Sequence, residues 1–225
     1  MHIEPGVVDG AKIALSHATA AAAFGIAARM TRDALRGDGG FLPFAARSLV
    51  SAGLVFSFFE ILPHYPVGVS EVHLILGSTL FLLFGAGPAA VGLAAGLLIQ
   101  GLFFTPSDLP QYGMNVTTLI VPLGGVVMLA KRIVAPGTAY VDLEYRQALA
   151  LSAAYQGGVV IWVAFWAFYG QGFGAGNLAA VAAFGAAYMS VLLIEPLADL
   201  TVLAAAKAYS GRGDLFLQRR LRDAA

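Results

Sequence analysis

Two short stretches carry nitrogen donors whose spacing suits a transition-metal ion. One is the chain start, Met1-His2, and the other is Ser70-Glu-Val-His73, where a polar loop meets an apolar segment. A terminal amine, the next amide nitrogen and the imidazole of residue two form fused chelate rings, and the ring of His73 would add a fourth nitrogen. A planar set of four nitrogens favours Ni(II), Cu(II) or low-spin Co(II), because Zn(II) prefers a tetrahedron and Mg²⁺ and Ca²⁺ prefer oxygen.

Four more polar residues are expected around these donors: His64, Glu71, Gln100 and Asn115. The second histidine of the loop is expected to flank the entrance, and the glutamate to attract cations to it. The two amides are expected to bridge helices or to orient a ligand histidine. Each donor histidine also has an ordinary interpretation: His2 as an exposed residue at a frayed terminus, and His73 as a helix cap at the membrane interface.

The composition is that of an integral membrane protein. Of 225 residues, 59% are hydrophobic and 12% are charged, and the long apolar runs exceed what a soluble core needs. The sequence has no cysteine, which excludes disulfides and thiolate metal sites, and its zero net charge gives a nucleic-acid partner no support. The start lacks a basic n-region and a cleavage site, so we expect no signal peptide and a retained Met1 amine.

The predicted fold class is all-α: a single polytopic membrane helix bundle of about seven transmembrane spans in the lipid bilayer. The expected spans are residues 12–28, 42–62, 73–84, 88–104, 114–130, 147–169 and 177 to about 194. The third and fourth are short for a hydrocarbon layer of roughly 30 Å, so one or both are expected to be partly re-entrant or to extend into loops. Within the bundle, Gly92 and Gly96 predict close helix packing.

The basic residues predict how the chain sits in the membrane. Lys and Arg gather after the first and fifth spans and in the tail, which fall on one side of a seven-span chain. Because positive loops stay in the cytoplasm, we expect a multi-pass protein of the cell (inner) membrane with an external N-terminus and a cytoplasmic C-terminus. Residues 1–11 would be an external segment, 12–208 the bundle and 209–225 a basic cytoplasmic tail. Glu195 and Asp199 are expected to pair with arginines of the inner loops.

Several of these motifs together resemble one family. They are the Met1-His2 start, the Ser70–Gly77 segment, Gly87-Pro88, Gln100 and the Gly113-Met-Asn115 turn. They are similar to the substrate-binding membrane (S) subunit of cobalt and nickel energy-coupling-factor ABC transporters, the CbiM/NikM family. The stretch 106–110 departs from the glycine-rich loop of that family, and the residues after His2 differ from its commoner pattern.

The resemblance implies a ligand set and a set of partners. The ligands carry over as the Met1 amine, the backbone and ring nitrogens of His2, and the ring of His73. The implied substrate is Co²⁺ or Ni²⁺, transported rather than used as a catalytic cofactor. The implied partners are ATP-binding subunits, a scaffold transmembrane subunit and a possible small accessory membrane subunit.

Three functions stay open at this point: a metal-capture subunit of an ATP-driven importer, a stand-alone secondary metal permease, and an intramembrane metalloenzyme. The sequence has no His-Glu-x-x-His, Gly-x-Ser-x-Gly or Walker lysine motif, so we expect no catalysis here and ATP hydrolysis in partner subunits. A permease would need acids or histidines along a path through the membrane, for which His17 is the only weak candidate. A metalloenzyme would need an open coordination position and a general base.

Overall fold

The computed structural model describes residues 3–37, 39–208 and 215–221, and these residues are mostly helical. The main helices are α1 (Ala14–Gly37), α2 (Phe41–Phe56), α3 (Gly77–Phe84), α4 (Ala86–Phe103), α5 (Tyr112–Ile133), α6 (Tyr145–Gln171), α7 (Ala175–Met189) and α8 (Glu195–Ala208). Shorter helical turns are η1 (Gly10–Ile13), η2 (Ser57–Ile61), η3 (Pro106–Gln111), η4 (Tyr140–Asp142), η5 (Ser190–Leu193) and η6 (Arg219–Leu221). A two-stranded antiparallel hairpin, β1 (Tyr65–Val67) and β2 (Ser70–Val72), completes the described elements.

Six helical stretches of the described chain are long and apolar enough to cross a membrane. They are Gly10–Gly37, Phe41–Ile61, Ala86–Phe103, Pro106–Ile133, Tyr145–Gln171 and Ala175–Ala208. Apolar helices of this length satisfy their own backbone hydrogen bonds, as the bilayer interior requires. The prediction of an all-α polytopic membrane bundle is therefore confirmed.

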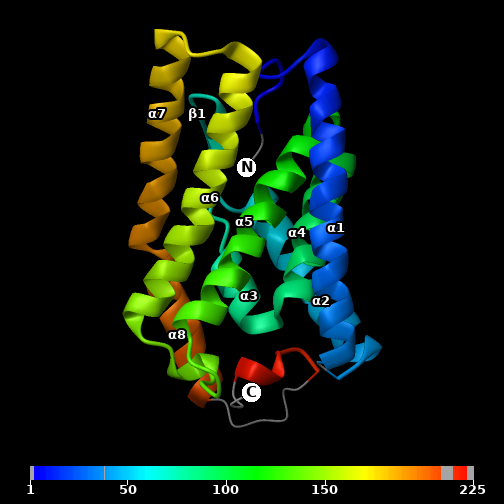
Figure 1. Ribbon diagram of the computed structural model, residues 1–225, viewed down its shortest axis with the longest axis vertical. Coiled ribbons are helices and arrows are strands. Elements are labelled where there is room, and N and C mark those ends of the chain that lie inside the picture. The colour runs from blue at the N-terminus through cyan, green and yellow to red at the C-terminus, as the bar shows by residue number, and fades with distance from the viewer. Residues whose placement is uncertain (1–2, 38, 209–214, 222–225) are drawn as a thin grey trace.

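The third pass of the chain differs from the other passes. Figure 1 shows α1 and α7 starting at one end of the bundle, while η6 lies at the opposite end, so the chain makes an odd number of passes. Six come from the long stretches, and the remaining one is made by the hairpin, the segment 73–76 and α3. With eight residues, α3 is only about 12 Å long at 1.5 Å per residue. The expected helix over 73–84 thus begins four residues late, at Gly77, because the residues before it carry on from the hairpin.

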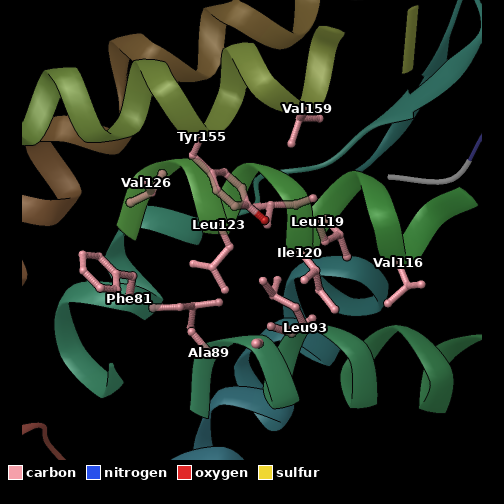
Figure 2. Close-up of a cluster of buried hydrophobic side chains, with 14 of the residues drawn as sticks. Phe81, Ala89, Leu93, Val116, Leu119, Ile120, Leu123, Val126, Tyr155 and Val159 are labelled. Carbon is pink, nitrogen blue, oxygen red and sulfur yellow. The ribbon is translucent and has the colours of Figure 1, made fainter. Parts of the chain in front are cut away.

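The apolar core is organised around α5. In Figure 2, Leu119, Ile120 and Leu123 of α5 lie between Leu93 of α4 on one side and Tyr155 of α6 on the other, and all five are fully buried. Elsewhere, α4 approaches α2 closely, because a Cβ at Gly92 would lie 2.1 Å from Ser51 Oγ and one at Gly96 would lie 2.7 Å from Val55 Cγ1. The predicted close packing at these two glycines is confirmed.

Candidate metal site

The register of the hairpin brings two histidines together. The π-helical turn η2 ends at Ile61, and the next residue, Leu62, has an extended backbone, as the residue preceding a proline prefers. In the strands that follow, Tyr65 pairs with Val72, so His64 and His73 are the next pair outward. Their rings stack with centroids 4.7 Å apart and planes inclined by 10°.

The tip of the hairpin is fixed by a glycine that packs on a helix. Gly68 has φ +64° and occupies the first of two turn positions, where a two-residue hairpin favours glycine. A Cβ there would lie 2.1 Å from the carbonyl oxygen of Ala180 in α7. The absence of a side chain therefore lets the turn touch the backbone of α7, and this contact holds the two histidines at a defined depth.

Three side chains of this hairpin form a group able to hold a metal ion. Glu71 and His73 lie two apart on β2 and its extension, and alternate residues of a strand point to one face. The His73 Nε2 lies 3.3 Å from Glu71 Oε2, and one donor atom each from His64, Glu71 and His73 lies within 4.8 Å of the others. His73 is buried, and Phe59 lies against it, with ring centroids 5.1 Å apart. The structure thus places His64 and Glu71, which were expected at the entrance, next to His73, which was expected to be a ligand.

The segment after the chain start runs beside β2. Ile3 forms a β-bridge with Ser70, and Glu4 N donates to Val69 O at 3.3 Å. Ile3 is 1% exposed, and its N–H donates to Asn115 Oδ1 at 3.0 Å. Asn115 therefore anchors this segment to α5. Met1 and His2, the other expected ligands, lie outside the described residues.

The second expected amide, Gln100, is buried in α4 and lies near a different carboxylate. Its Nε2 is 3.5 Å from Glu60 Oε2, the outer limit of a hydrogen bond. Gln100 and Asn115 line one small cavity, which Asp108 and Tyr112 also border. Both amides thus border one small space, and Asn115 also holds the N-terminal segment.

Acidic groups converge at this end of the bundle. Burial, and after it repulsion from Glu71 and Asp108, raises the pKa of Glu4 above its usual value. The repulsion, unlike the burial, reflects negative charge near Glu4. Such charge attracts cations toward the histidine pair.

A buried polar cluster at the other end of the third pass was not predicted. Glu195 and Asp199 are both fully buried, and they accept hydrogen bonds from side chains of α3 and α6. The expectation that they pair with inner-loop arginines is wrong, because α8 turns them toward the core. Their spacing of one helical turn, together with Ser78-Thr79 in the sequence, was the available signal.

Comparison with known proteins identifies one family. The family model CbiM, described as cobalt uptake substrate-specific transmembrane region, matches residues 2–212. No curated protein and no solved structure matches the chain. The matched range includes the hairpin, the histidine pair and every apolar helical stretch. The chain is therefore a multi-pass membrane protein that belongs to the CbiM family of cobalt uptake transmembrane components.

Proposed function

We propose that this chain captures Co²⁺ or Ni²⁺ from outside the cell and delivers it to an ATP-driven energy-coupling-factor importer. The observation that carries the proposal is the convergence of His64, Glu71 and His73 beside the N-terminal segment, within 4.8 Å of one another. Imidazole nitrogens suit both metals. The acidic surroundings raise the local cation concentration, as a capture site needs.

The proposed ligands are the Met1 amine, the His2 amide and ring nitrogens, and the His73 ring. Support comes from Ile3, which is buried and bridged to Ser70. Since neighbouring Cα atoms are only 3.8 Å apart, a chain fixed at Ile3 needs no long reach to bring its start to the His73 strand. In this arrangement His64 stacks on the ligand ring, and Glu71, whose Oε2 lies 3.3 Å from His73 Nε2, orients that ring.

A second ligand set consists only of side chains, namely His64, Glu71 and His73. Two imidazoles and one carboxylate leave open positions and impose no planar field, so this set would hold cobalt or nickel less selectively. The two sets differ in their need for a free amine at the chain start.

One experiment separates them. Purified protein with its native start is titrated with Ni²⁺ and Co²⁺ beside a version extended by one alanine before Met1. The extension keeps every side chain but displaces the amine and breaks the fused chelate rings. We expect high-affinity binding to be lost in the extended protein. Equal affinities would remove the Met1 amine from the site and leave the side-chain set.

The proposed energy source and partners follow from the family. ATP-binding subunits would hydrolyse ATP, a scaffold transmembrane subunit would transmit the motion, and a small accessory membrane subunit would complete some assemblies. The proposed orientation places the hairpin end outside and the C-terminus in the cytoplasm, because the basic loops lie at the C-terminal end.

The secondary permease is kept as a second candidate because of one observation. Glu195 and Asp199 are carboxylates buried in a membrane helix, and such groups are typical of ion and proton pathways. His17, the residue that the sequence offered for such a path, is exposed on α1.

A further inference from the structure

The acid pair of α8 lies in the bundle without a positive partner among the described residues. Glu195 and Asp199 are each 0% exposed and lie one helical turn apart, facing α3 and α6. Among the described residues neither forms a salt bridge. The nearest cation along α8, Lys207, lies two turns further on and bonds to Asp142 of η4 at 2.5 Å.

Neutral groups supply all the hydrogen bonds that reach the pair. Gln156 Nε2 donates to Glu195 Oε2 at 2.7 Å, and Ser152 donates to the same oxygen. Thr79 donates to Asp199 Oδ1. Two ionised carboxylates in this setting would place two like charges in a low dielectric with no counter-charge among the described residues, which is strongly unfavourable.

Ser78 gives a stereochemical reason for a proton on the pair. Its Oγ lies 3.1 Å from Glu195 Oε1 and 2.9 Å from Asp199 Oδ2. A hydroxyl has one proton to donate and two lone pairs that accept, so it can make two full hydrogen bonds here only if one carboxyl donates to it.

The amide of Gln156 belongs to the same cluster. Its Nε2 donates to Glu195 Oε2 at 2.7 Å, whereas its Oε1 is buried with no hydrogen-bond partner in the described part of the chain. The amide is neutral, so it leaves the charge of an ionised pair uncompensated.

We propose that Glu195 and Asp199 form a proton-binding site in which one carboxyl stays a neutral acid at neutral pH, and that this protonated pair holds the start of α3 in place. The site's ligand is a single proton, shared through Ser78. Tyr155 of α6 and Tyr188 of α7 are buried titratable groups on the surrounding helices, and Tyr140 is one on η4. The other titratable groups of α6 and η4 are exposed, namely Tyr145, Arg146, Tyr169 and Asp142.

The pair also reaches the segment that carries His73. Gln156 Nε2 donates to Ile75 O at 2.8 Å as well as to Glu195, and Ser78 is the second residue of α3. Residues 74–76 alone separate His73 from that helix. The protonated pair therefore acts as a positioning element for His73, a consequence that rests on the proposed metal-capture function.

The presence of a proton on the pair is tested by infrared spectroscopy of the full chain in lipid nanodiscs. A neutral carboxylic acid has a C=O stretching band at a higher wavenumber than the amide I band, and the carboxylic acid band shifts in D2O. We expect this band at neutral pH in the native protein, its loss in the E195Q/D199N double variant, and its retention in E4Q, which removes a carboxyl at the opposite end of the bundle. A native protein without the band, or a double variant that keeps it, would overturn the proposal.

Metal titration across pH tests the positioning. As pH rises, the native pair ionises and releases α3, so we expect metal affinity to fall at alkaline pH in the native protein but not in E195Q/D199N. If the carboxylic acid band is present but metal affinity varies with pH identically in the native protein and in E195Q/D199N, the proton site stands and its role in positioning His73 is overturned. A present band with no metal binding in any variant would overturn the metal-capture function and leave the proton site. Loss of the band on adding Co²⁺ or Ni²⁺, reversed by a chelator, would overturn the proton site in favour of a metal site.

Discussion

His73 is the residue on which the candidate site depends, because three different kinds of group meet its buried ring. The ring stacks on His64, lies against the edge of Phe59 and contacts the carboxylate of Glu71. Imidazole is the commonest metal ligand among side chains, and two of these rings lie side by side here.

At this scale we expect His73→Ala to lower Ni²⁺ and Co²⁺ affinity by more than about 100-fold, since it removes a ligand, and His64→Ala by about 10-fold, as for the loss of an orienting neighbour. Isothermal titration of purified protein measures both. His17→Ala is the matched control, because His17 is exposed on α1. A larger loss in His64→Ala than in His73→Ala would make His64 the main ligand.

The sequence predicted some of these residues and not others, for a physical reason. His73 was predicted from the Ser70–His73 motif, which is local. The closeness of His64 depends on the hairpin register, and it was foreseeable from the equal spacing of the two histidines about Gly68-Val69. The partners of Glu195 come from α3 and α6, far away in the chain, and no local pattern encodes them.

At the scale of elements, the hairpin is positioned by its tip. Gly68 combines a positive φ with a backbone contact on α7. The hairpin is short, and an isolated hairpin is at best marginally stable. Its geometry therefore depends on α7 and on the bridge from Ile3.

We expect Gly68→Ala to reduce metal affinity while the helical bundle persists, because the added Cβ would overlap the Ala180 carbonyl oxygen and lift the histidines from their place. Gly172→Ala is the control: Gly172 also has a positive φ, +75°, but a Cβ there meets nothing within 4 Å. Metal titration and circular dichroism of both variants separate the clash from backbone strain. An equal effect of the two substitutions would contradict the role of the α7 contact.

The extended segment before α3 depends on a single amide. Gln156→Leu removes the donor to both Ile75 O and Glu195 and leaves buried acceptors unsatisfied, each at a cost of about 1–3 kcal/mol. We expect a lower unfolding midpoint in a detergent denaturation series. Gln147→Leu, which removes a half-buried bond to Ile133 O and an exposed bond from Glu144 N, should be milder. Equal midpoints for the two variants would show that the buried bonds of Gln156 contribute no more than peripheral ones.

At the scale of the molecule, helix number and order were predictable from hydropathy, because long apolar runs have few other solutions in a membrane. The depth of the third pass in the membrane was not predictable, because a run of eight apolar residues is typical both of a short buried helix and of part of a full span. The proposed orientation follows from charge and is tested separately.

Single cysteines at Ser107 and Gly174 should react with an impermeant thiol reagent added to intact cells, whereas one at Gly137 should not. All three positions are exposed, and the sequence has no cysteine of its own, so labelling has no background. Labelling at Gly137 with none at the other two would reverse the orientation.

The isolated chain, reconstituted in vesicles, should give little Co²⁺ or Ni²⁺ accumulation without its partners, because it has no ATP-hydrolysing motif. Uptake of radioactive metal with and without an imposed proton gradient measures this. The E195Q/D199N variant is the informative control. Gradient-driven accumulation that this variant loses would support the permease.

The third pass has a consequence for how the protein is made. An eight-residue helix is too short and its leading segment too extended to enter the bilayer as an independent hydrophobic span. The groups that satisfy it, Gln156 and Glu195, are synthesised much later. Residues 62–84 must therefore remain near the insertion machinery until the C-terminal helices have been synthesised. In a chain whose synthesis is stalled before α6, this stretch should be cleaved by a protease that does not cleave it in the complete protein.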